Sequence, residues 1–299
     1  MVHKSDKKAE EGVKVANRTS PTVRRRRLAA ELRELRKASG HSREAVASHI
    51  GVAPSTITRI ENADSTAPPP TVAAMLDFYG VTGEEKEIWV TVAKQARRRG
   101  WWSQYGDTIP DWFKFYVGLE EEASEIRSYQ PEVVFGLLQT KGYMRAIMQS
   151  EVEPLSEGEL ERRVEVRLKR QERLAGQDAP KMWIVLNESA IRREIGGRPV
   201  MSEQLLHLAE LSQPGRLMLQ VLPFTAGAHP ALDGAFTVLG FPEPRDRDVV
   251  YVQSRRGGLY LEDPSDLTEY TEIFNHLMAK ALSPEESREM ILRITAEMT

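Results

Sequence analysis

The chain has 299 residues, more than a single domain usually contains, so two domains are expected. It contains no cysteine, which excludes a disulfide framework and thiolate chemistry and fits a reducing cytoplasm. The net charge of −3 hides an asymmetry: residues 1–61 carry 14 Lys and Arg against 7 Asp and Glu, and the remainder carries 27 against 37. A basic segment before an acidic body is expected when only one domain faces nucleic acid.

The N-terminal segment, residues 1–22, is polar and lacks hydrophobic periodicity, so we expect a disordered arm. It has charges but no apolar core, unlike a signal peptide. No apolar run in the chain approaches the length that spans a membrane. We therefore expect a cytoplasmic protein without a membrane partner.

A run of four arginines precedes the first predicted helix, which is marked by an apolar stripe at Leu28, Leu32 and Leu35. The run either contacts DNA phosphates, directly or as an arm in an adjacent groove, or is the solvated start of a helix. Its position beside the motif that follows favours phosphate contact. The residues are Arg24, Arg25, Arg26 and Arg27.

Residues 42–61 have the pattern of two short helices joined by a tight turn. Ser42 can cap the first helix, and Gly51 stands where the chain reverses and a positive φ is favoured. Pro54 suits the first turn of the second helix, because its missing N–H would have no partner there. The pattern predicts a helix-turn-helix, whose second helix enters the major groove of DNA.

The outward face of the second helix distinguishes a DNA-binding motif from two helices that only pack against each other. Ile57 and Ile60 point inward, so the residues between them and beside them point outward. This outward face has no carboxylate, which suits a surface that meets phosphates and base edges. Its polar and cationic residues are Ser55, Thr56, Thr58 and Arg59.

Two further helices are predicted over 71–79 and from residue 82 to about 99, where Arg97, Arg98 and Arg99 match the helix dipole. Residues 23–99 therefore form an all-α, five-helix DNA-binding head, with the recognition helix third. From residue 100 the character changes: residues 101–120 hold seven aromatic side chains. Such clustering could form a ligand cage or a base-stacking platform, but the core of an interdomain seam is favoured.

The remainder, residues 100–299, is predicted to be an α+β domain with a small sheet. Strand patterns occur at 126–129, 182–186, 217–222, 236–239 and 249–252. Residues 133–140 are predicted to lead into a helix that runs through Met148. Further helices are predicted at 156–174, 188–194 and 199–211, and at the C-terminus over 265–282 and 284–298. The helix over 156–174 is expected to bury its apolar residues Leu160, Val164, Val166, Leu168 and Leu174. The pairs Gly196–Gly197 and Gly257–Gly258 are interpreted as turns.

No motif for catalysis is found. None of the six histidines is paired at helical spacing, so a structural zinc site is not expected. Neither a nucleophile elbow nor a phosphate-cradling glycine loop is present. The loop over residues 223–234 contains His229 and Asp233, which could line a ligand pocket, but a connecting loop is favoured. We expect no enzyme, no cofactor and no metal.

The sequence resembles known regulators over nearly all of residues 20–299. Residues 26–79 resemble the XRE (Cro/repressor-like) helix-turn-helix family. The body phrases WWSQYGDTIPDWFKFYVGLEEEA, ERRVEVRLKRQERL, QVLPFTAGAHPALDGAFTVL and VVYVQSRRGGLYLEDPSDL resemble the large C-terminal domain of the actinobacterial WhiJ-like XRE proteins. The chain departs from that pattern at Phe135, where proline is usual, and at Gln253, where glutamate is frequent.

The resemblance implies a sequence-specific DNA-binding transcriptional regulator with a C-terminal sensing or dimerisation domain. The alternative it implies is an antitoxin-like protein that binds a small protein encoded nearby and regulates its own operon. Laid onto this chain, the family's docking geometry places Pro54, Ser55 and Arg59 at base edges. The same geometry gives phosphate contacts to Arg43, Thr56 and Thr58.

We further expect a homodimer on a roughly palindromic stretch of double-stranded DNA, because one small head buries too little DNA to be tight and selective. The head uses its apolar stripes in its own core, so the body should carry the dimer contact. The candidate surfaces are the aromatic stretch 101–116 and the final helices with Ile273, Phe274, Leu277, Met290, Ile291, Leu292 and Ile294.

Overall fold

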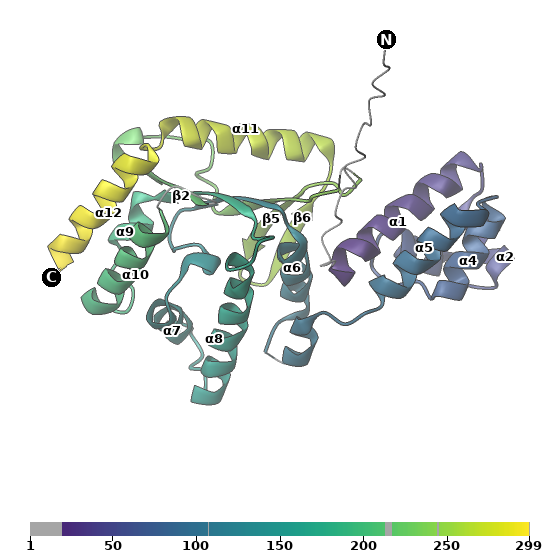
Figure 1. The fold of residues 1–299 in the computed structure, drawn as a ribbon, viewed down its shortest axis with the longest axis horizontal. Coiled ribbons are helices and arrows are strands. Elements are labelled where there is room, and N and C mark those ends of the chain that lie inside the picture. The colour runs from purple at the N-terminus through teal and green to yellow at the C-terminus, as the bar shows by residue number, and fades with distance from the viewer. Residues whose placement is uncertain (1–19, 107, 213–216, 244, 299) are drawn as a thin grey trace, which may run out of the picture.

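The computed structural model describes residues 20–298 except 107, 213–216 and 244. Within this part, a helical head precedes an α+β body (Figure 1), which confirms the predicted fold class. The head contains α1 (Pro21–Ala38), α2 (Arg43–Ile50), α3 (Pro54–Glu61), α4 (Pro69–Phe78) and α5 (Gly83–Ala96).

The helices of the head begin and end as the local sequence directs. The Ser42 hydroxyl accepts a hydrogen bond from the Ala45 N–H (3.1 Å) at the start of α2. Gly51 ends α2 in the left-handed conformation, with φ 72° and ψ 37°. The predicted apolar stripes meet in one core, in which Leu32, Ile57 and Met75 are fully buried.

The first helix starts earlier than the sequence predicted. The Ser20 hydroxyl caps α1 by accepting from the Thr22 N–H (3.2 Å), and Val23 is buried in the hydrophobic core of the body. The prediction of disorder is therefore wrong for residues 20–22, because capping and burial order them. The rest of the predicted arm, residues 1–19, lies outside the described residues.

A short connection with η1 (Trp101–Tyr105) leads to α6 (Asp111–Glu122), which packs directly on α1. α1 and α6 can approach closely because residue 118 is a glycine: a Cβ added at Gly118 would overlap the Thr22 hydroxyl. Trp102 is buried beside the same glycine. Part of the aromatic stretch therefore lies where α1 meets the body, whereas Trp112, Phe113 and Tyr116 pack in the core of the body itself.

The body is built on one mixed sheet of six strands in the order β3-β2-β1-β4-β5-β6. β1, β2 and β3 are parallel, while β4 pairs antiparallel with β1 and starts an antiparallel run through β5 to β6. The strands are β1 (Glu125–Gln130), β2 (Lys181–Asn187), β3 (Leu217–Leu222), β4 (Phe236–Gly240), β5 (Val249–Ser254) and β6 (Gly257–Leu261).

Helices cover both faces of this sheet (Figure 1). One face carries α11 (Pro264–Lys280), which buries Phe274 and Leu277 against strand residues such as Val238. The other face carries α6 and the remaining helices of the body. These are α7 (Lys141–Gln149), α8 (Glu157–Gln171), α9 (Glu188–Arg192), α10 (Arg198–Leu211) and α12 (Pro284–Met298), with the short 3₁₀ helices η2 (Gly136–Leu138) and η3 (Glu172–Leu174). A further 3₁₀ helix, η4 (Phe224–Ala226), follows β3, and its Ala226 packs against the core on the α11 face.

Two details of the sequence prediction are wrong. The Gly257–Gly258 pair opens the edge strand β6, because the turn is made by Arg255 and Arg256 instead. The Gly196–Gly197 pair is a turn as predicted, with positive φ at both residues. Leu168, expected inside, is exposed on α8. Among the described residues, no helix has the length and apolar character needed to cross a membrane.

Most of the apolar residues proposed for a dimer surface are used within the chain. Phe274, Leu277 and Ile291 are fully buried, and Met290 and Ile294 are nearly so. They pack α11 and α12 against opposite faces of the same sheet. The C-terminal helices therefore do not provide the apolar surface that the sequence suggested.

Candidate nucleic-acid interface

The helix-turn-helix is formed by α2, a turn at Gly51–Ala53, and α3. The turn closes through the Gly51 and Val52 N–H groups, which both donate to the Ala47 carbonyl. Ala53 is extended, and Pro54 begins α3 without a side-chain cap. In the first turn of α3, the Thr56 N–H donates to the Ala53 carbonyl (2.9 Å).

The structure brings the predicted base-facing residues together on the outer side of α3. Pro54, Ser55 and Arg59 are exposed, while Ile57 and Ile60 are buried in the core of the head. The predicted phosphate-binding residues Thr56 and Thr58 are half-buried at the margins of this surface. The Thr58 hydroxyl donates to the Pro54 carbonyl (3.4 Å), one turn earlier.

Glu61 is the last residue of α3, and its carboxylate joins three helices of the head. Its side chain is fully buried and accepts from Arg36 Nε and Nη2 (2.5 and 3.0 Å) and from Arg43 Nε (2.9 Å). Burial opposes ionisation, but the hydrogen bonds from the two arginines outweigh it, so the pKa of Glu61 lies below its usual range. The Glu61 carbonyl also accepts from Arg33 Nη2.

This arrangement decides what the outer surface of α3 presents. The acidic group of the recognition helix is turned inward and neutralised, so the exposed side keeps a cation and hydroxyls. Arg43 is held by Glu61 through Nε, yet 38% of its side chain remains exposed at the start of α2. A guanidinium anchored in this way can still offer its terminal N–H groups to a phosphate.

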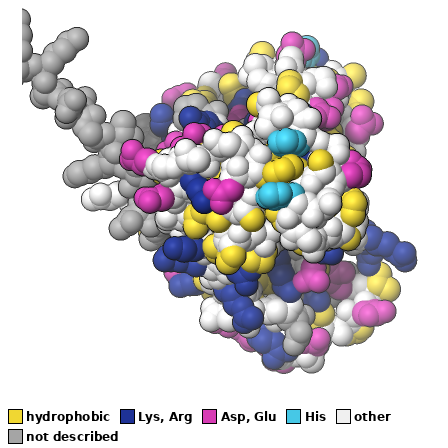
Figure 2. All heavy atoms as spheres, turned by 90° about the vertical axis from the view of Figure 1, so that its right-hand side faces the viewer, with side chains coloured by type: hydrophobic (Ala, Val, Ile, Leu, Met, Phe, Trp, Pro, Cys, Tyr) yellow, Lys and Arg dark blue, Asp and Glu magenta, His cyan; other side chains and the backbone are white. Residues whose placement is uncertain are grey.

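The adjoining surface carries a ring stack that sequence reasoning missed. His41 precedes α2 and His49 lies in its last turn, and both stack on the ring of Phe78 from α4, with centroids 4.1 Å apart in each case. Figure 2 shows histidine side chains beside hydrophobic ones on the face of the head that is turned to the viewer. The three residues are too far apart in the chain for a local pattern to reveal the stack.

The predicted phosphate-binding arginines at the start of α1 have a different environment. Arg26 pairs with Glu262 (2.9 Å) and donates to the Arg247 carbonyl (3.2 Å). Arg27 binds Asp246 through both Nε and Nη2 (2.9 and 2.5 Å), and the Asp246 side chain is only 3% exposed. These contacts tie α1 to the body.

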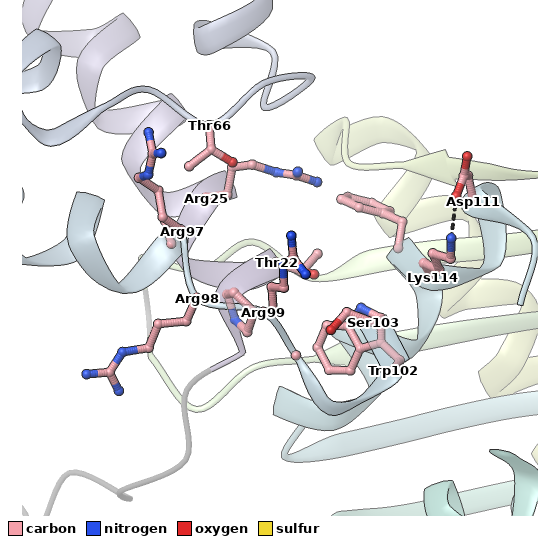
Figure 3. Close-up of a pocket in the computed structure, with 14 residues that line it drawn as sticks. Thr22, Arg25, Thr66, Arg97, Arg98, Arg99, Trp102, Ser103, Asp111 and Lys114 are labelled. Carbon is pink, nitrogen blue, oxygen red and sulfur yellow. Dashed lines mark hydrogen bonds and ion pairs between the residues drawn. The ribbon is translucent and has the colours of Figure 1, made fainter. Parts of the chain in front are cut away.

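The other two arginines of the run also lie at the junction of the domains. Arg25 extends from α1 toward the body, where its guanidinium lies over the ring of Phe115, 5.9 Å from the centroid (Figure 3). Arg24 lies near the carboxylate of Glu122, and burial lowers its pKa. Phosphate contact by this run thus stays a prediction, and the geometry favours an interdomain role for Arg26 and Arg27.

A basic cavity of about 520 Å³ separates head and body beside Arg25. Five cationic side chains and one carboxylate, Asp111, line it, and Asp111 pairs with Lys114 (2.6 Å) (Figure 3). Arg97, Arg98 and Arg99 contribute from the end of α5, although Arg98 points away from the hollow. The sequence feature that could have revealed this cavity is the run Arg97, Arg98 and Arg99. From the sequence, that run was explained by the dipole of the preceding helix alone.

The loop with catalytic-looking residues joins β3 to β4. His229 Nε2 lies 3.3 Å from the Tyr129 hydroxyl, and His229 Nδ1 accepts from the Ala231 N–H (3.3 Å). Burial lowers the pKa of His229. Asp233, but not His229, lines a small hollow of about 70 Å³. Among the described residues, no group of three or more His, Asp or Glu side chains is placed to hold a metal ion.

Comparison with known families separates the chain into the same two parts. Residues 27–89 match the family described as a helix-turn-helix domain. Residues 113–293, more than half of the chain, match the family described as a domain of unknown function, DUF5753. No curated protein and no solved structure matches the chain. Membership of the narrower WhiJ-like group, and an actinobacterial source, stay predictions.

Proposed function

Because the chain belongs to the DUF5753 family and also carries a helix-turn-helix domain, we propose that it is a sequence-specific DNA-binding transcriptional regulator. The observation that carries this proposal is the outer surface of α3, on which Ser55 and Arg59 are exposed and no carboxylate competes. In this docking mode the recognition helix lies in the major groove.

The roles of the side chains follow from their positions on the head. Arg59 is long enough to donate two hydrogen bonds to a guanine edge, and Ser55 and Pro54 lie beside it near the start of α3. Arg43, Thr56 and Thr58 surround this patch and bind backbone phosphates, which set the register of the protein on the duplex.

The body would influence DNA binding through α1, which belongs to both domains. Its first turns are held by Glu262 and Asp246, and its later turns pack in the core of the head. A change in the body at these contacts would therefore move a helix that packs on α3, the recognition helix. This continuity supports a sensing role for the C-terminal domain.

We further propose that the regulator acts as a homodimer on a two-fold symmetric operator, because one head contacts only one half-site. The exposed apolar side chains that remain for such a contact include Met218 on the edge strand β3 and Leu259 on the opposite edge strand β6. Sedimentation of the full chain at micromolar concentration tests this part, and a monomer would contradict it.

The alternative function, antitoxin-like binding of a small protein encoded nearby, stays a prediction. It can be tested by mixing the purified chain with the product of each neighbouring gene and measuring complex formation. A complex that changes DNA binding would join the two functions, whereas no complex with any neighbour would remove the alternative.

The test of the proposed function is selection of duplexes from a random pool by the full chain, followed by binding measurements on the enriched sequences. We expect enrichment of a defined motif and binding that is about 10³-fold or more tighter than to unrelated duplex at the same salt. Enrichment of no motif would overturn sequence-specific regulation.

A further inference from the structure

The body contains a second cavity, of about 480 Å³, at a site that none of the DNA-binding residues touch. It lies between α6, α8 and η2 on one side and the ends of β4 and β5 on the other. A volume of this size is typical of sites for small organic molecules. Its walls divide into an aromatic part and a cationic part.

The cationic part holds three arginines. Arg255, in the turn between β5 and β6, is exposed and pairs with Glu151 at 3.7 Å. The other two project from α8 three residues apart. Arg170 is fully paired: its Nε and Nη2 each lie 2.7 Å from the carboxylate oxygens of Glu120. Both side chains of this pair are more than nine-tenths buried. Arg170 also lies over the rings of Phe113 and Tyr116, so its charge and its geometry are satisfied within the protein.

Arg167 has no such partner. Its Nη1 donates to Gln139 Oε1 (2.6 Å), and among the described residues it has no ion pair with a carboxylate. Gln139 is itself fixed, because its Nε2 donates to the Val134 carbonyl (2.6 Å). Burial, and then the charge of Arg170, lower the pKa of Arg167 to about 10, so the group stays cationic at neutral pH.

Arg173, in η3 directly after α8, is an arginine whose hydrogen bonds are all made within the protein fold. Arg173 donates to three backbone carbonyls, those of Glu121, Ala123 and Asp178. Arg167 uses one of its five N–H donors in the hydrogen bonds of the described residues, and it is part of the lining of the cavity. A bound anion would accept hydrogen bonds from the remaining N–H donors of Arg167 and balance its charge.

The aromatic part of the wall is continuous with this guanidinium. The rings of Phe113 and Tyr116 are stacked with centroids 5.3 Å apart, and the ring of Tyr251 follows 4.3 Å from that of Tyr116. Phe113 is half-buried, whereas Tyr116 and Tyr251 are 3% and 5% exposed, so Phe113 offers most of the ring surface of this cluster. Such a surface binds ring systems through burial and offset stacking. The cavity therefore offers one uncompensated positive charge next to an aromatic wall.

We propose that this cavity binds a small organic acid with one negative charge and an aromatic or cyclic apolar body, its carboxylate paired with Arg167. A monoanion fits because Glu120 neutralises Arg170 and Glu151 pairs with Arg255, which leaves the half-buried charge of Arg167 to match. A bidentate contact to a carboxylate suits the planar guanidinium. The proposal does not rest on DNA binding, because the ligand site and the head share no residue.

The test uses isothermal calorimetry on the full chain at neutral pH with benzoate, 1-naphthoate and indole-3-carboxylate. Each acid is compared with its primary amide, which keeps the ring and removes the charge. We expect saturable binding of at least one acid. The dissociation constant of its amide should be larger by about tenfold or more. Arg167→Met should bring the acid to the level of the amide, and Arg167→Lys should keep part of the difference.

Two further variants separate ligand binding from folding. Arg162→Met removes an exposed arginine of the same helix and should bind the acid like the unchanged chain. Ala235→Phe places a ring at the cavity wall without altering its charge, and it should abolish binding of acid and amide alike. No binding of any acid at millimolar concentration, equal binding of acid and amide, or full binding by Arg167→Met would each overturn the proposal.

Discussion

The buried carboxylate of Glu61 makes the sharpest prediction about the head. Glu61→Gln keeps the size of the side chain and removes its charge, which leaves Arg36 paired with a neutral amide. Removing one partner of a buried ion pair costs about 3–5 kcal/mol. Arg36 is 11% exposed and contributes most of this loss, whereas Arg43 is 38% exposed and its contact with Glu61 counts as a surface pair. We therefore expect the lower end, about 3 kcal/mol.

The same contact predicts a dependence on pH. The pKa of Glu61 is lowered from its ordinary value of 4.5 in the folded chain. The ionised form is thus favoured by folding, and its stabilisation is complete above pH 4.5 and lost as the pH falls through the lower folded value. In Glu61→Gln this part of the acid destabilisation should disappear.

The assay is hydrogen exchange, read by mass spectrometry on peptides that cover α2 and α3 in the full chain. Glu34→Gln is the matched control, because it removes an exposed ion pair between Glu34 and Lys37 on α1 and should change the exchange little. If Glu61→Gln left these peptides as protected as the control does, the carboxylate would not hold the three helices together.

Three further predictions concern the same region and its junction with the body. Asp246→Asn removes the carboxylate that binds Arg27 and should lower the local stability at the start of α1 by about 2–3 kcal/mol, measured by hydrogen exchange. Burial raises the pKa of Glu122 from 4.5 to about 7, which favours its neutral form on folding, so stability should fall as the pH rises from 4.5 to about 7 and then level off. Glu122→Gln should remove that slope in a thermal unfolding series, and a slope that persists would assign it to another group. Gly51→Ala should lower the thermal stability by about 1–2 kcal/mol through its positive φ alone, since open space surrounds the position; no change would contradict this strain.

Local sequence patterns predicted most of the helices and strands, because the apolar spacing and the turn residues that define each element lie within that element. The stripe at Leu28, Leu32 and Leu35, the glycine at position 51 and the inward isoleucines of α3 were enough for the head. The strands of the body also had the expected apolar runs, except β6. There Gly257 and Gly258 have the composition of a turn, and only the pairing with β5 makes them a strand.

The partners of the charged residues could not be predicted from local patterns. Arg26 and Arg27 meet carboxylates that lie 236 and 219 positions further along the chain. Arg167 stands in a heavily charged helix, where one more arginine looks like part of a solvated face. Its role depends on Glu120, which pairs with Arg170, so that Arg167 has no carboxylate ion pair within the part of the chain that the structure describes.

The central claim is that α3 reads DNA sequence, and replacement of Arg59 tests it most directly. Binding of the unchanged chain and of Arg59→Ala is measured on a selected duplex and on a scrambled duplex at one salt concentration. We expect a loss of about 1–3 kcal/mol on the selected duplex, relaxed preference at one base pair, and little loss on the scrambled duplex. An equal loss on both duplexes would place Arg59 among the phosphate contacts, and no loss on either would contradict recognition by α3.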